Sequence, residues 1–139
     1  MKTARLTRRY VLRALHNLIN PDLSDEENAR LYGLCYRLHG HDYQIMVTVE
    51  APIHDASGLS VNRDELDTIV HRELIAPYDG QFLNEFFINT SGEALSRLFF
   101  VKLEKAVAPL FKNGGRLVQV SIQETRKNWF AHSSALAKT

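Results

Sequence analysis

The sequence predicts an α+β fold in which one antiparallel β-sheet carries two helices on a single face. Three observations support this prediction. Apolar residues alternate with polar ones in segments near both ends of the chain, which is typical of half-buried strands. Two segments in the middle have apolar residues at helical spacing. Turn residues separate the segments, and their order is β-β-α-α-β-β.

Length and composition limit the possible classes of protein. The chain has 139 residues, and we expect residues 1–139 to form one domain. Its net charge of +1 predicts neither nucleic-acid binding nor an acidic partner. No apolar run approaches the roughly 20 residues of a membrane span. Residues 1–9 are basic but lack the apolar core of a signal peptide. A single cysteine excludes an internal disulfide, so we expect a cytoplasmic protein.

The first strand is predicted over residues 4–16. One face carries the even-numbered residues Ala4, Leu6, Tyr10, Leu12 and Ala14, and His16 continues that face. Leu15 interrupts the alternation, so the pattern defines the end of the strand less well. Residues 20–22 predict a turn, and residues 24–27 predict a capping box that opens a short helix.

The second strand is predicted to follow the sequence Cys-Tyr-Arg-Leu-His-Gly-His at residues 35–41 and to run to about Glu50. Its odd positions form an apolar face, Tyr43, Ile45, Val47 and Val49. His39 and His41 have the same parity, so two imidazoles extend this face.

Two longer helices are predicted in the middle of the chain. Asn62 caps the first, which carries Leu66, Ile69, Val70 and Leu74 at helical spacing and ends at Pro77. We expect an ordered loop over residues 78–89. A second capping box at Thr90-Ser91-Gly92-Glu93 opens a longer helix, in whose apolar stripe only Lys102 is charged.

The last two strands are predicted over residues 117–124 and 129–132. In the first of them Val118, Val120, Ile122 and Glu124 share one face. An unpaired carboxylate on such a face costs several kcal/mol. Glu124 therefore either turns out to solvent at the strand end or waits for a donor pair. Adjacent N–H groups on a guanidine-like edge, as in pterins and guanines, would satisfy both of its oxygens.

The histidines suggest a metal site. A lone histidine on an apolar face is usually a hydrogen-bonded core residue. However, a His-x-His pair in a strand places both rings on one side about 7 Å apart at Cα. With His16 as the third ligand, His39 and His41 predict a zinc site with an open fourth position. Cys35 is either an inert thiol or a thiolate activated by the cation or a nearby base.

Taken together, these residues resemble the 6-pyruvoyltetrahydropterin synthase and 6-carboxytetrahydropterin synthase family. The motif Cys-x-x-x-His-Gly-His is intact at residues 35–41, and its three-residue gap resembles the bacterial, queuosine-pathway branch. Phe-x-Ala-Ala-His appears weakly at residues 12–16. Leu-Asp-His-x-x-Leu-Asn is recognisable at residues 78–84, and Pro-Thr-x-Glu at residues 90–93. The closing Glu-Thr is intact at Glu124-Thr125.

The resemblance implies a T-fold (tunnelling fold) subunit with ββααββ order. Subunits of this family assemble into homotrimers or homohexamers whose sheets close a barrel, which removes exposed sheet edges. The active sites lie between subunits, so Cys35 and Glu124 of one site would come from different chains. The implied activity is that of a lyase acting on 7,8-dihydroneopterin triphosphate and giving 6-carboxytetrahydropterin or a related tetrahydropterin.

The resemblance also implies residue roles. His16, His39 and His41 would hold Zn²⁺, which lowers the pKa of the substrate hydroxyls. Cys35 would act as the general base, with Asp79 as part of the couple that deprotonates it. Glu124 would bind the pterin, together with Thr125 and Ser91.

One departure from the family pattern concerns catalysis. The family pairs its cysteine with an Asp-His couple, but here Gly80 follows Asp79, and glycine cannot relay a proton. His71 and His132 are candidate substitutes. Two alternatives to the full lyase therefore stand. One is a diverged member that binds zinc and a pterin but performs partial or different chemistry, and the other is a non-catalytic oligomeric binding protein.

Overall fold

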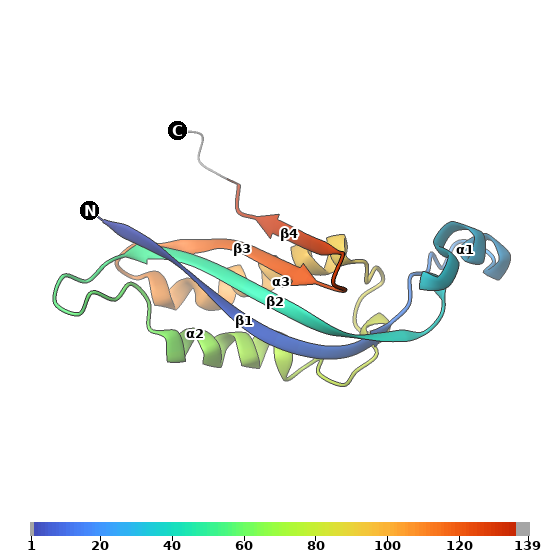
Figure 1. Cartoon of the computed structure of the whole chain (residues 1–139), viewed down its shortest axis with the longest axis horizontal. Coiled ribbons are helices and arrows are strands. Elements are labelled where there is room, and N and C mark those ends of the chain that lie inside the picture. The colour runs from blue at the N-terminus through green and yellow to red at the C-terminus, as the bar shows by residue number, and fades with distance from the viewer. Residues whose placement is uncertain (1, 136–139) are drawn as a thin grey trace.

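The computed structural model describes residues 2–135 of the chain. Within this range the chain forms four strands, three α-helices and four shorter helical turns (Figure 1). In chain order they are β1 (Thr3–His16), α1 (Asp25–Tyr32), η1 (Gly33–Tyr36), β2 (His39–Pro52), α2 (Arg63–Val70), η2 (His71–Ile75), η3 (Leu83–Glu85), α3 (Gly92–Val107), η4 (Ala108–Phe111), β3 (Arg116–Gln123) and β4 (Trp129–Ser133). The predicted order of strands and long helices is confirmed.

The strands form one antiparallel sheet in the order β1-β2-β3-β4. β1 and β2 pair without interruption from Thr3 opposite Pro52 to His16 opposite His39. Leu15 therefore does not disturb the register. Its side chain lies on the other face and is 42% exposed. The continuous pairing carries the histidine-bearing ends of both strands beyond the helices (Figure 1).

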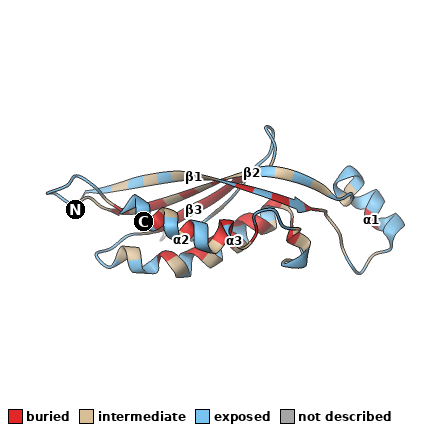
Figure 2. Cartoon of the chain, turned by 90° about the horizontal axis from the view of Figure 1, so that it is seen from below, coloured by how far each residue is buried: buried red, intermediate tan, exposed pale blue. Residues whose placement is uncertain are grey.

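Both long helices cover the same face of the sheet, and the buried residues lie between the two layers (Figure 2). Asn62 caps α2 by accepting a hydrogen bond from the amide of Glu65. The core joins even-numbered residues of β1 and odd-numbered residues of β2 to the apolar stripes of the helices, among them Leu12, Ile45, Leu66, Phe99 and Leu103. This packing confirms the parity predicted for both strands. No helix within residues 2–135 is long and apolar enough to cross a lipid bilayer.

The cap of α3 differs from the prediction. Ser91, not Thr90, is the N-cap, because its side chain accepts a hydrogen bond from the amide of Ala94. Thr90 is instead buried, with 1% of its surface exposed. Thr90 and Ser91 can both act as a cap, so the sequence leaves the start of the helix uncertain by one residue. In the structure Thr90 is buried and Ser91 is the cap.

The apolar face of β3 also differs in one residue. The pairing with β2 shifts between Thr48 and Val49, so that Val49 lies opposite Leu117 and Val118 is an extra residue in β3. Beyond such a bulge, the residues that faced the core by their odd or even number face the other side of the sheet. Leu117 therefore joins Val120 and Ile122 in the core cluster in place of Val118.

Candidate functional site

Three imidazoles meet where β1 ends and β2 begins. His16 is the last residue of β1 and lies directly opposite His39, the first residue of β2. His41 lies opposite Ala14. All three side chains are on the helix-facing side of the sheet, as their parity predicts. Directly opposed residues on one face have Cβ atoms about 5 Å apart, so the antiparallel register brings the rings together.

The rings contact one another edge to face. Their centroids are 4.5 Å apart for His16 and His39, 5.0 Å for His16 and His41, and 4.8 Å for His39 and His41. One nitrogen from each ring can be chosen so that all three lie within 4.8 Å of one another. This spacing allows three nitrogen donors to surround one cation.

Hydrogen bonds orient two of the rings. Nδ1 of His16 donates to the carbonyl oxygen of Thr90 at 2.9 Å, and Nδ1 of His39 donates to the carbonyl oxygen of Arg37 at 2.6 Å. With the proton on Nδ1, Nε2 keeps its lone pair. A metal-binding histidine is commonly oriented in this way by a partner on its other nitrogen.

Burial keeps the inner imidazoles neutral. It lowers the pKa of His16 to about 4, and it also lowers the pKa of His41. The Nε2 atoms of both residues are buried without a hydrogen-bond partner among residues 2–135. Buried polar atoms are rarely left unpaired. Two neighbouring ring nitrogens of neutral imidazoles, both buried without a partner in the described chain, are therefore suited to bind a metal ion.

Glu124 lies beside this cluster. It directly follows β3, and its Oε1 is 3.9 Å from Nε2 of His41, with 15% of each side chain exposed. Burial raises the pKa of Glu124, and the positive charge that His39 carries when protonated opposes this rise. Its side chain therefore does not turn out to solvent, which was one of the two alternatives from the sequence. A ligand with two N–H donors would stabilise the ionised carboxylate.

Cys35 and Asp79 are not tied directly to the imidazoles. Cys35 is exposed in η1, in the connection between β1 and β2 that also contains α1. Asp79 is exposed, and its Oδ1 accepts a hydrogen bond from the backbone amide of Arg13 at 3.1 Å. The hydrogen bonds of residues 2–135 join neither side chain to the three rings.

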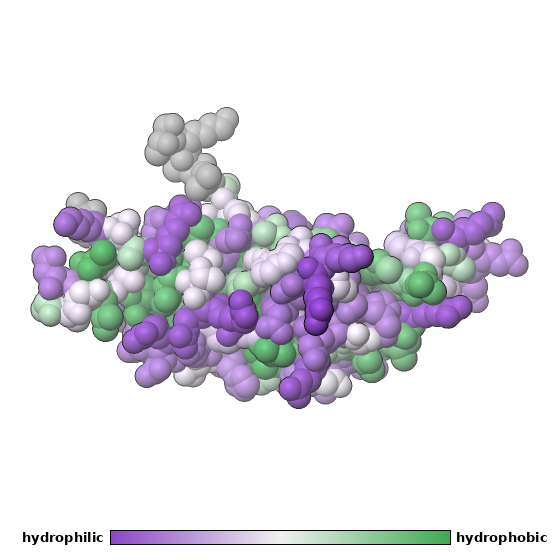
Figure 3. All heavy atoms as spheres, viewed as in Figure 1, coloured by the Kyte–Doolittle hydropathy of each residue, from purple (hydrophilic) through white to green (hydrophobic). Residues whose placement is uncertain are grey.

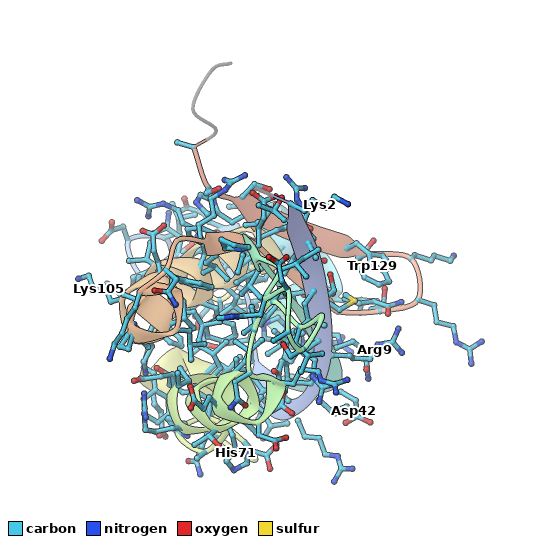
Figure 4. All side chains as sticks on the ribbon, turned by 90° about the vertical axis from the view of Figure 1, so that its left-hand side faces the viewer. Lys2, Arg9, Asp42, His71, Lys105 and Trp129 are labelled. Atoms are coloured by element: carbon cyan, nitrogen blue, oxygen red, sulfur yellow. The ribbon has the colours of Figure 1, made fainter. Side chains whose placement is uncertain are left out.

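The space beside Gly80 is open. Gly80 has φ +73°, and a Cβ built on it would meet no atom of residues 2–135 within 4 Å. It lines a groove of about 410 Å³ together with His41, Arg13 and Asp42. Neither candidate substitute lines this groove. His71 lies at the lower edge of the molecule in Figure 4, where it lines a different pocket with Arg9 and Tyr10 of β1. The ring of His132 packs 5.0 Å from that of Phe100. Neither candidate substitute therefore lies beside Gly80 in the single chain.

The remaining predicted site residues lie in two turns. Ser91 caps α3, as described above. Thr125 is exposed in the turn after β3, and its Oγ1 accepts a hydrogen bond from the amide of Lys127 at 3.2 Å. Thr125 directly follows Glu124, so both belong to the same β3–β4 connection.

Comparison with known proteins identifies the family. The family model described as 6-pyruvoyl tetrahydropterin synthase matches residues 5–134. The chain belongs to this family.

Relatives and a solved structure agree with this identification. The chain is similar to the 6-pyruvoyl tetrahydrobiopterin synthase of Drosophila melanogaster, with 33% identity over 128 residues, covering 88% of this chain and 75% of that protein. It is 32% identical over 132 residues to the Homo sapiens protein of the same name, covering 90% and 88% of the two chains. The structure of Caenorhabditis elegans 6-pyruvoyl tetrahydropterin synthase matches with a TM-score of 0.84 and 27% identity, covering 97% and 98%. The fold is therefore the T-fold of this family.

Two residues near the three histidines, Thr90 and Tyr43, were not predicted as part of the site. Thr90 orients His16 through its backbone carbonyl, which no side-chain pattern could indicate. Tyr43 is 1% exposed, and its ring centroid lies 5.2 Å from that of His41. Its hydroxyl is buried without a partner among the described residues, and burial raises its pKa. Its parity with His39 and His41 was a usable signal, but the residue was counted only as apolar.

Proposed function

We propose that the chain is a zinc-dependent lyase that converts 7,8-dihydroneopterin triphosphate into 6-carboxytetrahydropterin or a related tetrahydropterin of the 6-pyruvoyl type. The observation that carries the proposal is the convergence of three imidazoles beside Glu124. Membership of the pterin synthase family supports the substrate class. The three-residue gap between Cys35 and His39 favours the 6-carboxytetrahydropterin product.

His16, His39 and His41 would hold the ion through their unprotonated nitrogens. The bound ion would supply Lewis acidity, which lowers the pKa of a substrate hydroxyl and stabilises developing negative charge. The protein's part is to keep the ligands neutral and oriented. Burial keeps His16 and His41 neutral by lowering their pKa values, and the two Nδ1 hydrogen bonds orient His16 and His39.

Glu124 would bind the pterin through the ring's adjacent N–H donors, with Thr125 and Ser91 as further substrate contacts. The pKa of this carboxyl is raised in the free protein, so a donor pair is needed to favour the ionised form. Its position 3.9 Å from His41 would place the bicyclic ring beside the ion and the side-chain hydroxyls over it.

Cys35 would move protons as the general base, and Asp79 would assist it. Because both are exposed and apart from the imidazoles in one chain, we propose that the complete site forms between subunits of a homotrimer or homohexamer. Three exposed leucines surround Cys35 in the sequence, Leu31, Leu34 and Leu38. Apolar side chains gather at the end of the molecule formed by α1 (Figure 3). Closing the free edges of β1 and β4 into a barrel would give a further reason to assemble.

The open space beside Gly80 favours a second candidate function. If no imidazole enters from a neighbouring subunit, the thiol lacks the partner that deprotonates it. The protein would then bind zinc and a pterin but catalyse only part of the reaction or a different one. A non-catalytic oligomeric binding protein is the limiting case.

Metal analysis and incubation with 7,8-dihydroneopterin triphosphate test these functions. Stoichiometric zinc, release of triphosphate and formation of a 6-carboxy or 6-pyruvoyl product would support the lyase. Triphosphate release without either product would support partial chemistry. Purified protein that neither retains nor takes up zinc, and leaves the substrate unchanged, would contradict both and support the binding protein.

A further inference from the structure

Residues 79–84 run along the free edge of β1 beside the cluster. The amide of Gly80 donates to the carbonyl of Arg13 at 2.6 Å, and the amide of Leu15 donates to the carbonyl of Gln81 at 2.9 Å. These bonds extend the sheet by a short stretch of backbone pairing. This backbone pairing does not reach Asn17, the residue that follows His16.

The side chain of Asn84 continues this pairing by one residue. Its Oδ1 accepts a hydrogen bond from the amide of Asn17 at 3.0 Å, and its Nδ2 donates to the carbonyl of Asn17 at 2.8 Å. A carboxamide offers the same donor and acceptor as a peptide unit. Asn84 therefore satisfies both backbone groups of the residue that follows a proposed metal ligand.

Thr90 joins the same group of hydrogen bonds. Its hydroxyl lies 3.1 Å from the carbonyl oxygen of Asn17 and 3.3 Å from Oδ1 of Asn84, and its own carbonyl accepts from His16. The backbone next to His16 and the acceptor for its ring are thus held by two side chains that also contact each other.

The thiol-bearing turn is attached to the same stretch of chain. Nδ2 of Asn17 donates to the carbonyl of Tyr36 at 3.2 Å, and the amide of Leu18 donates to the carbonyl of Cys35 at 2.8 Å. Residues 16–18 therefore connect one imidazole to the segment that carries the only cysteine of the sequence.

We propose that Asn84 is a positioning residue that holds His16 in its ligand orientation and keeps the Cys35 turn in register with it. This inference rests on the proposed metal site. Truncating Asn84 would leave the N–H of half-buried Asn17 unpaired and would remove one of the two hydrogen bonds to its carbonyl, so the strand end would loosen. Partners behind metal ligands typically contribute about 10–100-fold to metal affinity.

The test compares Asn84→Ala with Asn62→Ala in the full chain. Asn62→Ala removes the cap of α2, far along the chain from the cluster, and controls for general destabilisation. Zinc affinity is measured by competition with a chromophoric chelator. We expect Asn84→Ala to weaken zinc binding about tenfold or more and Asn62→Ala to leave it unchanged. Equal loss in both variants, or unchanged affinity in folded Asn84→Ala, would overturn the proposal.

Thr90→Val and Thr90→Ser provide a second pair if Asn84→Ala does not fold. Valine removes only the hydroxyl and keeps the carbonyl that accepts from His16, whereas serine keeps both groups. We expect zinc affinity to fall in Thr90→Val and to be retained in Thr90→Ser. Equal affinities in the two variants would count against the proposal.

Amide hydrogen exchange separates this inference from the proposed function. In metal-free protein, we expect exchange of the segments 16–20 and 33–37 to accelerate in Asn84→Ala, while the centre of β2 keeps its protection. If the wild-type chain binds no zinc, the proposed function fails, but this exchange result still tests the positioning role. Unchanged exchange in both segments would refute that role whatever the metal content.

Discussion

Arg8 in β1 forms a two-point ion pair with Asp67 in α2. Nε and Nη2 of the guanidinium lie 3.0 Å and 2.6 Å from the two carboxylate oxygens, and the hydroxyl of Tyr10 donates to the same carboxylate at 2.6 Å. Planar two-point pairs of this kind are the stronger ion pairs in proteins. This contact fastens the edge strand of the sheet to the helical layer beneath it.

We therefore expect Asp67→Asn to lower the free energy of unfolding by about 1 kcal/mol, since the pair is partly exposed. The matched control is Asp42→Asn, which weakens a much more exposed pair with Arg13. Urea denaturation at neutral pH measures both variants. An equal or smaller loss in Asp67→Asn would show that this pair contributes no more than an ordinary surface pair.

The same pair predicts a pH dependence. The hydrogen bond from Arg8 is the main cause that lowers the pKa of the Asp67 carboxyl. Its contribution to stability is therefore complete above the unfolded pKa of about 3.9 and is lost as the pH falls through the lower folded value. Asp67→Asn should lose less stability than the wild type when the pH is lowered from neutral to about 3. Parallel losses in the two proteins would contradict this assignment.

Tyr43→Phe should stabilise the metal-free protein. The hydroxyl is buried without a partner among residues 2–135, and such a group costs about 1–3 kcal/mol. Phenylalanine keeps the ring packing against His41. Thermal denaturation in the presence of a chelator measures the change, with Tyr36→Phe as a control for an exposed tyrosine hydroxyl bonded to Asp25. A lower melting temperature for Tyr43→Phe would mean that the hydroxyl has a partner in solution.

Zinc should raise the melting temperature of the wild-type chain but not that of His41→Ala. A ligand at a hundredfold excess over its Kd stabilises the folded state by about 2.7 kcal/mol, provided that it does not bind the unfolded chain. His71→Ala, which removes a histidine outside the cluster, should behave like the wild type. Zinc stabilisation that persists in His41→Ala would place the ion elsewhere.

Cys35→Ala should abolish turnover and leave zinc bound. The thiol is exposed and is not one of the three clustered ligands, so its removal should not affect the ion. Product formation and metal content measured on the same sample separate the two effects. A variant with normal turnover would show that Cys35 is not the base, and a variant without zinc would make it a ligand.

Gly80→Ala should destabilise the protein by about 1 kcal/mol, because φ at this position is +73°. Since no atom in the described part of the chain lies within 4 Å of the added Cβ, the cost is conformational, not steric. Asparagine tolerates this backbone region better than alanine, so Gly80→Asn should cost less. Urea denaturation of both variants measures the difference. An equal cost would point to a steric origin.

Much of the fold could be predicted because its signals are local. Each signal involves residues only a few positions apart in the sequence. Examples are the alternation in residues 4–16 and 117–124, the cap at Asn62 and the glycines before β3. The errors arose where two local solutions were nearly equivalent. Thr90 and Ser91 could both cap α3, and a single extra residue, Val118, changed which side chains of β3 face the core.

By itself, the sequence determined that His16, His39 and His41 share one face of neighbouring strands, because strand parity depends only on counting residues. It also determined that Gly80 follows Asp79 in place of the histidine that the family pattern has. Only the tertiary structure decided that His16 lies opposite His39, that the carbonyl of Thr90 accepts from its ring, and that Asn84 pairs with Asn17. These relationships join segments up to 74 residues apart. Their geometry depends on register and packing, which no local pattern specifies.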